Sequence, residues 1–312
     1  MKLNRRQFIG MIGIGLSGSI ARKYSVVEPK ENKSVQNPAN QQNERLETIV
    51  RFQHPEKLLF FAPQMSEAAI AAVFGVELEN YREVKNRITS ETHRAAEELL
   101  ADAEFAKRVD RLPFKEGATI VGIGESTMDD LQSWLEILRN ILDLRRPQDR
   151  IRVVNNGVSA QTTTTALRRF TATMWQKPDW IFCSLGGNDA ARSGFEATKT
   201  NVSLDETAKN LAEMRRLAAQ ESQAKWIWLT LPPIDEERIK AYAPFKMGRV
   251  VWRSPDIEGV NEFLRRQSET VIDLTEPFGR PPRTTFLMPD GLHVSLAGHK
   301  ATVKTLIEKL TA

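Results

Sequence analysis

Cysteine is almost absent from this 312-residue sequence, and histidine, tyrosine and long apolar runs are scarce. The single cysteine, Cys183, excludes an intramolecular disulfide. Hydrophobic residues make up 41% of the chain and charged residues 27%. These values are typical of a globular protein that buries one large core or two smaller ones, and they exclude a disordered chain.

A strong net charge is also missing. The chain has 44 Lys and Arg residues against 40 Asp and Glu residues, a formal charge of +4. Three of the cations, Lys2, Arg5 and Arg6, precede Ala21 with no acid among them, so the rest of the chain carries 41 basic against 40 acidic side chains. Because the remaining basic residues alternate with acids, we expect no basic face for phosphates and no nucleic acid partner.

The first 21 residues have the features of an export signal. Arg5 and Arg6 precede an apolar stretch from Phe8 to about Ile20, and small residues surround Ala21. The Arg-Arg pair resembles the twin-arginine type, which predicts the twin-arginine export machinery as a partner of the precursor. The apolar stretch is shorter than the roughly 20 residues of a membrane span. We therefore expect residues 1–21 to direct the protein to the periplasm or the cell exterior, with an uncleaved membrane anchor as the alternative.

Two segments separate this signal from the main domain. Residues 22–46 are rich in Lys, Asn, Gln, Pro and Glu, which predicts a flexible linker. Residues 47–113 show helical patterns, among them "SEAAIAAVFG", which opens with a potential cap at Ser66 and ends at Gly75. His54 lies in an irregular segment and His93 on a solvated helix, so we expect neither to act in catalysis. The sequence thus predicts a helical N-terminal segment ahead of a domain at 114–312.

From residue 114 onward the pattern changes to alternating strands and helices. Five short runs are rich in β-branched and aromatic residues, at 118–124, 151–156, 180–186, 226–231 and 271–274. An apolar stripe with helical spacing follows the first run and comprises Leu131, Trp134, Leu135, Leu138, Ile141 and Leu142. This order predicts an α/β domain with a mostly parallel five-stranded sheet and helices on both faces.

The turn around Ser126 in "IVGIGESTMDD" fits no common nucleophile or phosphate template. Met128 replaces the second glycine of the G-x-S-x-G elbow, and no G-K-[ST] follows as in a P-loop. Ser126 is therefore either a helix cap or a nucleophile on another kind of turn.

Residues suited to acyl transfer follow the ends of four strands. Ser126 follows the first strand, Gly157 the second and Asn188 the third, while Asp290 and His293 follow the last. In an open parallel sheet these ends meet at one edge, where ligands bind. We therefore expect the five residues to lie close together.

These residue types favour one chemistry. The Ser126 hydroxyl becomes a nucleophile when a base such as His293 removes its proton, and Asp290 can accept the Nδ1–H of that imidazole and so fix its tautomer. The N–H groups of Ser126 and Gly157 and the side-chain amide of Asn188 can donate to an oxyanion, each contributing on the order of 3 kcal/mol.

In this order, the blocks around Ser126, Gly157, Asn188 and His293 resemble the signature of the SGNH hydrolases, the GDSL-type esterase and lipase superfamily. Asp290-Gly-Leu-His293 resembles its D-x-x-H block, and the resemblance covers roughly residues 115–312. It implies a three-layer, flavodoxin-like α/β/α sandwich with a Ser126, Asp290 and His293 triad. It also implies an oxyanion hole from Ser126, Gly157 and Asn188, and ester hydrolysis with no metal and no cofactor.

Two positions depart from the family pattern. Glu125 stands where the motif has Asp, and we expect its longer side chain to bond to nearby backbone amides rather than to join the triad. The second block often reads N-x-G-x-S-G-D, whereas Ala160 and Gln161 occupy its last two places. Gly157 itself is intact.

Other residues have simpler interpretations. His299 in the last helix favours a surface or supporting role, and Cys183 is expected to be a buried strand residue. Four acids lack the spacing of a metal site, namely Asp129, Asp130, Asp189 and Asp290. Five tryptophans could line a sugar or acyl pocket, but their spacing places most of them on core faces: Trp134, Trp175, Trp180, Trp228 and Trp252.

The sequence predicts an exported serine esterase that forms an acyl-enzyme on Ser126. Its substrate would carry acyl or acetyl groups on a carbohydrate, a lipid or a small alcohol, and the lack of a long apolar lid segment favours short acyl groups on a carbohydrate or a general ester. An acyltransferase with the same triad and a non-catalytic binding module with the same fold remain open. The sequence does not indicate an oligomeric state.

Overall fold

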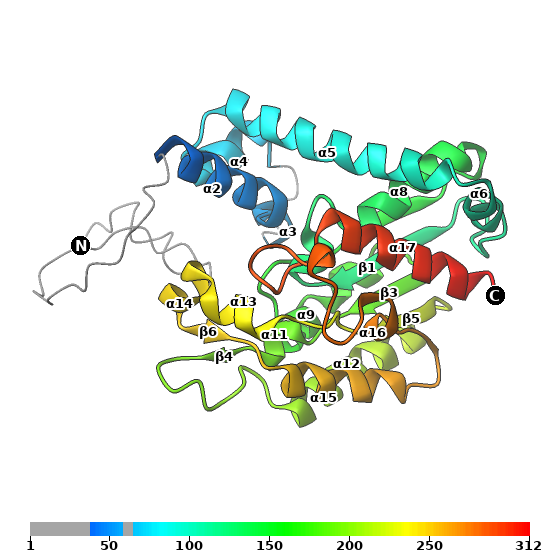
Figure 1. Ribbon diagram of the computed structural model, residues 1–312. Coiled ribbons are helices and arrows are strands. Elements are labelled where there is room, and N and C mark those ends of the chain that lie inside the picture. The colour runs from blue at the N-terminus through cyan, green and yellow to red at the C-terminus, as the bar shows by residue number, and fades with distance from the viewer. Residues whose placement is uncertain (1–37, 59–64) are drawn as a thin grey trace, which may run out of the picture.

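The computed structural model describes residues 38–58 and 65–312, so the predicted export signal lies outside the described residues. A five-stranded sheet in the order β2-β1-β3-β5-β7 forms the centre of the molecule (Figure 1). Its strands are β1 (Thr119–Gly124), β2 (Arg152–Asn155), β3 (Trp180–Ser184), β5 (Lys225–Leu229) and β7 (Thr270–Ile272). All four pairings are parallel, which confirms the predicted sheet and its five strands.

Helices cover both faces of this sheet, as a parallel sheet requires. One face packs against α8 (Trp134–Arg145) and α17 (Leu296–Leu310). The other packs against α9 (Thr163–Arg168), α10 (Phe170–Met174), α12 (Leu204–Glu221) and α15 (Ser254–Arg265). The two faces hold two separate hydrophobic clusters, and the predicted three-layer α/β/α sandwich is confirmed.

The predicted helix after β1 is α8, and it begins later than the stripe suggested. Ser133 caps it by accepting a hydrogen bond from Glu136 N, and Trp134 is its first residue. Leu131 therefore lies outside the helix and packs against a third apolar cluster that includes Ile70. The other five residues of the stripe are buried.

The N-terminal segment is helical, as predicted, and adds a further layer to one face. It contains α2 (Pro38–Phe52), α3 (Pro55–Leu58), α4 (Glu67–Phe74), α5 (Leu78–Leu100) and α6 (Ala103–Asp110). Helix α5 packs across α8 and α17 (Figure 1). Ser66 caps α4 and the left-handed Gly75 ends it, as predicted.

The start of this segment differs from the sequence prediction. Helix α2 begins at Pro38, inside the stretch predicted as a linker up to residue 46. Its polar residues gave no apolar periodicity, but proline is favoured at the first position of a helix. Helices α5 and α6 are separate because the Asp102 side chain caps α6 by accepting hydrogen bonds from Glu104 N and Phe105 N.

Short elements complete the described fold. The sequence analysis did not predict the small antiparallel sheet of β4 (Arg192–Ser193) and β6 (Val250–Val251), because each strand has only two residues. Four short helices lie in the loops, namely α11 (Gly187–Ala190), α13 (Glu236–Ala241), α14 (Ala243–Gly248) and α16 (Thr275–Phe278).

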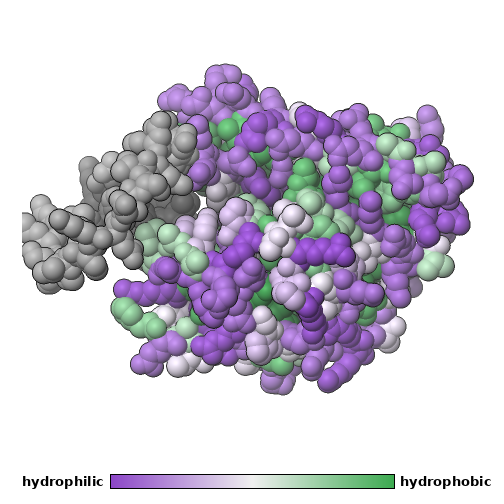
Figure 2. Space-filling model, viewed as in Figure 1, coloured by the Kyte–Doolittle hydropathy of each residue, from purple (hydrophilic) through white to green (hydrophobic). Residues whose placement is uncertain are grey.

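The visible surface is mostly hydrophilic, with apolar residues in small separate groups (Figure 2). This agrees with the amphipathic α5, which buries residues such as Ile88 and Leu99 and exposes charged ones. Among residues 38–58 and 65–312, no helix is both long and apolar enough to span a membrane.

Candidate active site

The structure brings Ser126, His293 and Asp290 together in one hydrogen-bonded series. Ser126 Oγ lies 3.0 Å from His293 Nε2, and His293 Nδ1 lies 2.6 Å from Asp290 Oδ2. A carboxylate only accepts, so Nδ1 carries a proton in this contact and Nε2 of the neutral ring can accept the hydroxyl proton. The arrangement can therefore convert the Ser126 hydroxyl into a nucleophile.

Ser126 is placed by a sharp change from strand to helix. Strand β1 ends at Gly124, Glu125 is extended, and Ser126 is the first residue of the one-turn helix α7 (Ser126–Asp129). The cap position belongs to Glu125, so the Ser126 side chain does not cap the helix and instead contacts His293. The nucleophile interpretation of this turn is the one that the geometry supports.

A tight turn before α17 holds the acid and the imidazole. Asp290 Oδ1 accepts hydrogen bonds from Leu292 N and His293 N, both at 2.9 Å. Gly291 between them has a left-handed φ of 77°, which glycine adopts without strain. The D-G-L-H sequence thus leaves Asp290 Oδ2 free to bind the imidazole.

The environment shifts the pKa values of this pair in opposite directions. Burial would lower the pKa of His293, but the charge and hydrogen bond of the Asp290 carboxylate raise it above its ordinary value of 6.5. Burial would raise the pKa of Asp290, but the His293 ring and two backbone N–H groups lower it overall. Asp290 therefore remains ionised and favours a proton on His293.

The three predicted oxyanion donors meet beside Ser126, but two of them already have acceptors. Gly157 N donates to Asn155 Oδ1 at 2.9 Å. Asn188 Nδ2 lies 2.8 Å from Glu125 Oε2 and 3.1 Å from Gln161 O, which occupies both of its hydrogens. Ser126 N makes no hydrogen bond within the described part of the chain. An oxyanion would find Ser126 N–H available and would have to share the other two donors.

Glu125 connects the nucleophile turn to the Asn188 loop, as predicted from its longer side chain. Its carboxylate accepts hydrogen bonds from Gly187 N and Asn188 N, both at 2.9 Å, besides the Asn188 side chain. Burial raises the pKa of Glu125 to about 7, although these bonds oppose the shift. Glu125 is therefore only partly ionised near neutral pH, and it does not contact His293.

Gly157 is required because the chain passes close to the nucleophile helix. A Cβ atom at this position would lie 2.8 Å from Asp129 N, closer than real Cβ contacts, and 3.0 Å from Met128 C, tighter than most of them. Its φ is outside the left-handed region, so conformational freedom is not the reason for the glycine. Any side chain here would push the Gly157 loop away from α7.

Ala160, where the family pattern often has glycine, has a left-handed φ of 63°. This conformation destabilises the folded state by roughly 1–2 kcal/mol for a residue with a Cβ atom. Glycine avoids that cost, but its greater freedom in the unfolded chain lowers the free energy of unfolding by roughly 0.4–1 kcal/mol. We expect Ala160→Gly to raise the free energy of unfolding by about 0.5–1 kcal/mol, because the first effect is the larger. Denaturant unfolding of both chains would test this, and a destabilised Ala160→Gly variant would contradict it.

Sequence reasoning missed three residues of the N-terminal segment that reach the site. His54 is buried, and its Nδ1 lies 2.8 Å from Asp129 Oδ1. Arg51 pairs with the fully buried Asp130, and the Phe52 ring lies 4.9 Å from the His293 ring, centroid to centroid. We expected His54 not to act in catalysis, and the sequence carries no signal for its contact with Asp129, because the two residues are 75 positions apart.

The remaining histidines and the cysteine lie away from the reacting hydroxyl. His299 is fully buried rather than on the surface, and its Nδ1 accepts a hydrogen bond from Trp134 N at 3.2 Å. His93 is exposed on α5 and contacts Asn140. Cys183 is buried in β3, as predicted.

The surroundings of the tryptophans and of the four acids indicate structural roles. Four of the five tryptophans considered are buried in the core, and Trp175 is 69% exposed. Asp189 accepts hydrogen bonds from Thr163 and Thr207, while Asp129, Asp130 and Asp290 have the partners given above. Among residues 38–58 and 65–312, no group of three or more His, Cys, Asp and Glu residues is arranged to hold a metal ion.

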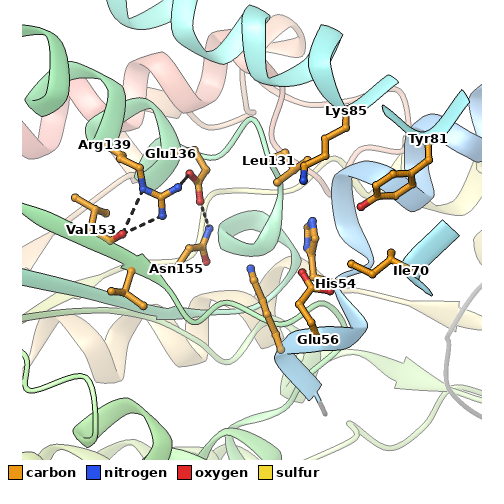
Figure 3. A pocket seen from close by; sticks show the side chains of 12 residues that line it. His54, Glu56, Ile70, Tyr81, Lys85, Leu131, Glu136, Arg139, Val153 and Asn155 are labelled. Atoms are coloured by element: carbon orange, nitrogen blue, oxygen red, sulfur yellow. Dashed lines mark hydrogen bonds and ion pairs between the residues drawn. The ribbon is translucent and has the colours of Figure 1, made fainter. Parts of the chain in front are cut away.

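A cavity of about 300 Å³ lies beside the site, between the N-terminal segment and the edge strand β2. Figure 3 shows the side chains of Tyr81, Lys85 and His54 pointing toward the same space, with Asn155 on the opposite wall. Two buried atoms on its lining, His54 Nε2 and Glu56 Oε2, have no hydrogen-bond partner within the described residues.

Comparison with known proteins identifies the family. Residues 118–301 match the model of the GDSL-like lipase/acylhydrolase family. A catalytic mutant of Axe2, an acetylxylan esterase from Geobacillus stearothermophilus, has a similar structure with a TM-score of 0.50 and 19% identity, covering 63% of this chain and 95% of that one. LAE5, an α/β hydrolase from the metagenome of Lake Arreo, Spain, has a TM-score of 0.49 and 22% identity, covering 63% and 96%. The search of curated proteins gave no match.

The family match includes Ser126, Gly157, Asn188, Asp290 and His293, and it extends over more than half of the chain. The likeness to the Axe2 structure, at 19% identity, extends to the fold alone. This chain therefore belongs to the GDSL-like lipase/acylhydrolase family of the SGNH hydrolases and is a hydrolase of ester bonds.

Proposed function

We propose that this chain is a serine esterase that hydrolyses carboxylic esters through an acyl-enzyme on Ser126. The observation that carries the proposal is the pair of contacts from Ser126 Oγ to His293 Nε2 and from His293 Nδ1 to Asp290 Oδ2. Nucleophile, base and orienting acid are thus within hydrogen-bonding distance in the order that acyl transfer requires.

The proposed reaction has two stages. Ser126 Oγ attacks the ester carbonyl carbon while its proton passes to His293 Nε2, and His293 then gives that proton to the oxygen of the departing alcohol. Water next attacks the acyl-enzyme, loses a proton to His293 and releases the acid, and Ser126 recovers its proton. Asp290 holds the imidazolium that exists between these transfers.

The oxyanion of each stage needs hydrogen-bond donors, and of the three candidates only Ser126 N–H has no other acceptor among residues 38–58 and 65–312. We assign Gly157 N–H and the Asn188 amide as the other two. Both must exchange or share their present acceptors, Asn155 Oδ1 for Gly157 and Glu125 or Gln161 for Asn188. The hydrogen bonds that Asn188 donates to Glu125 are weaker when Glu125 is protonated. The side-chain amide of Asn188 is therefore the oxyanion donor whose availability depends on pH.

Acetyl or other short acyl groups on a carbohydrate are the proposed substrates. The described chain shows no long apolar lid helix near Ser126, which would suit a long acyl chain. The name of Axe2, an acetylxylan esterase, makes acetylated xylan the first polysaccharide to test.

A substrate panel tests this proposal. The purified protein should hydrolyse p-nitrophenyl acetate faster than the palmitoyl ester, release acetate from acetylated xylan and act poorly on lysophosphatidylcholine. EDTA should leave the rates unchanged. Preference for the palmitoyl ester would overturn the short-acyl assignment, and transfer of the acyl group to an added alcohol in place of hydrolysis would identify an acyltransferase.

The rate should rise with pH through one ionisation. His293 accepts a proton only when neutral, so kcat/KM should reach a plateau above an apparent pKa that is higher than the ordinary 6.5. Asp290→Asn removes the carboxylate that raises the pKa of His293, so the midpoint should move to lower pH while kcat falls by about 10⁴. Profiles of kcat/KM from about pH 5 to about pH 9 measure both effects. A midpoint that Asp290→Asn leaves in place would contradict this assignment.

Export through the twin-arginine route is a further expectation, based on residues outside the described part of the chain. Replacing Arg5-Arg6 by Lys-Lys should retain the precursor in the cytoplasm, because that route reads the arginine pair. Fractionation of cells that make either chain measures this. Unchanged export of the Lys-Lys variant would exclude the twin-arginine route.

A further inference from the structure

Residues 51–57 of the N-terminal segment contact the candidate active site, although they lie outside the family match at 118–301. The stretch runs from the end of α2 to α3. Its Phe52 ring packs on the His293 ring, and Arg51 O accepts a hydrogen bond from Leu131 N at 3.2 Å. A segment beyond the family domain thus touches both the proposed base and the chain that leaves the nucleophile helix.

The helix that carries Ser126 depends on outside contacts for its position. Helix α7 has four residues, too few to be stable alone. Two carboxylates follow at its end, Asp129 and Asp130, and their side chains are 2% and 0% exposed. Buried carboxylates require charged or hydrogen-bonding partners.

Arg51 supplies the partner of Asp130. Its guanidinium binds both carboxylate oxygens, with Nε 3.0 Å from Oδ1 and Nη2 in contact with Oδ2. Burial would raise the pKa of Asp130, but the His299 ring, 3.6 Å away, and the Arg51 guanidinium lower it to about 2. Without Arg51 this carboxylate would keep the hydrogen bond from Gln132 N at 2.9 Å and the contact with His299, whose pKa burial lowers, but it would have no permanently charged partner.

Asp129 links three parts of the site. Its Oδ1 accepts from Lys57 Nζ at 2.6 Å and lies 2.8 Å from His54 Nδ1. Its Oδ2 accepts from Ser159 N and Ser159 Oγ at 2.8 and 2.9 Å. Lys57 Nζ also donates to Gly157 O at 3.2 Å. The nucleophile helix, the Gly157 loop and the N-terminal segment therefore meet at one carboxylate.

Polar and apolar contacts both hold the N-terminal segment to the domain. The cavity of about 300 Å³ separates the segment from β2 on the other side of His54, as Figure 3 shows. A cavity contributes no packing contacts. Beside the cavity, the ion pairs and hydrogen bonds at Asp129 and Asp130 join the segment to the domain, together with the Phe52–His293 ring contact and the packing of Leu131 against the third apolar cluster.

We propose that Arg51, His54 and Lys57 are positioning residues of the active site, which fix the Ser126 helix relative to the Gly157 loop by holding Asp130 and Asp129. This rests on the proposed esterase function. The family domain of this chain is then catalytically complete only with its own N-terminal segment in place. Loss of these contacts slows the chemical step more than it weakens substrate binding.

Lys57→Met tests the proposal with little risk to folding, because Lys57 is partly exposed and methionine keeps the length of its stem. A displacement of the nucleophile by about 1 Å can cost roughly 10²-fold, so we expect kcat to fall roughly 10-fold to 100-fold with KM within about twofold. The matched control is Lys85→Met, since Lys85 pairs with Glu67 on the same segment but contacts none of the reacting residues. Lys85→Met should keep kcat within about twofold of the parent.

Arg51→Lys and Arg51→Ala extend the test, with Arg87→Ala as the control. Arg87 pairs with Glu47 and Glu91 at the surface, so its loss should change neither kcat nor labelling. Lysine keeps the charge but not the two-point contact with Asp130, so Arg51→Lys should recover part of the kcat that Arg51→Ala loses. The rate at which a fluorophosphonate labels Ser126, measured on chains shown to be folded by circular dichroism, should fall in parallel with kcat.

Two results would overturn the positioning role. The first is a Lys57→Met chain with parental kcat and labelling rate, and the second is an equal loss in Lys85→Met, which would show a general effect on stability. If Arg51→Ala does not fold, Lys57→Met still decides the question. A parent chain without Ser126-dependent esterase activity would instead refute the proposed function itself.

Discussion

Ser126→Ala and His293→Ala should each lower kcat by about four to six orders of magnitude, and the double variant should be little worse than either. The two groups form one unit, because the Ser126 hydroxyl reacts only as its proton moves to His293 Nε2, 3.0 Å away. Removal of either partner therefore removes the same step. Steady-state kinetics on p-nitrophenyl acetate, with enzyme purified away from host esterases, measures the losses.

Matched controls for these variants are Ser203→Ala and His93→Ala. Ser203 caps α12 and His93 is exposed on α5, so kcat of both controls should stay within about twofold of the parent. Additive losses in the double variant would contradict the single unit. A folded His299→Ala chain that lost turnover while His293→Ala kept it would show that the base had been assigned wrongly.

Asn188→Ala should lower kcat by roughly 10²- to 10³-fold and leave KM largely unchanged. The Asn188 amide would meet negative charge that exists only in the transition state, so substrate binding does not depend on it. The variant also removes bonds to Glu125 and Gln161 O, which could reduce activity by loosening the loop. The prediction therefore needs a control that separates these two effects.

Asn261→Ala provides that control. Asn261 is 2% exposed, and its amide bonds to Leu231 N and Leu231 O, so its removal also breaks two buried hydrogen bonds. We expect both variants to lower the melting temperature, but only Asn188→Ala to lower kcat in the folded state. An equal loss of kcat in the two variants would mean that Asn188 acts through stability and not as an oxyanion donor.

The sheet and the core of the site were predictable because their signals are local. Each strand is a short run of β-branched and aromatic residues, and Ser126, Gly157, Asn188 and His293 each follow the end of a strand. The rule that these ends meet at one edge then brings distant residues together. The Asp290 contact was predictable for the same reason, since Asp290 lies only three positions before His293, with Gly291 between them.

The contacts of the N-terminal segment were not predictable, because they join residues far apart in the sequence. Arg51 and Asp130 are 79 positions apart, and nothing in the spacing around either indicates the other. His54 lies in the irregular stretch between α2 and α3, as predicted, but nothing in the sequence indicates its burial against Asp129. The part of α2 up to residue 46 was predicted as linker because its polar residues give no apolar periodicity, whereas the buried Ile49 and Val50 lie in the segment predicted to be helical.

The acceptors that the oxyanion donors bind in the free protein were also not predictable from the sequence. The motif identifies Gly157 and Asn188 as donors, but it does not indicate that Asn155 Oδ1 and Glu125 Oε2 bind them in the free protein. These bonds depend on side-chain conformations that no residue pattern specifies. They also give a physical reason to expect that the two donors contribute less than fully free N–H groups.

The central claim is that Ser126 is the nucleophile that forms the acyl-enzyme, and covalent phosphonylation of Ser126 tests it most directly. The protein is treated with a fluorophosphonate, and its intact mass and labelled peptide are determined by mass spectrometry. We expect one adduct per chain, on Ser126, with labelling lost in Ser126→Ala and greatly slowed in His293→Ala. An adduct on another residue, or a Ser126→Ala chain that still hydrolyses p-nitrophenyl acetate at the parental rate, would contradict the serine mechanism.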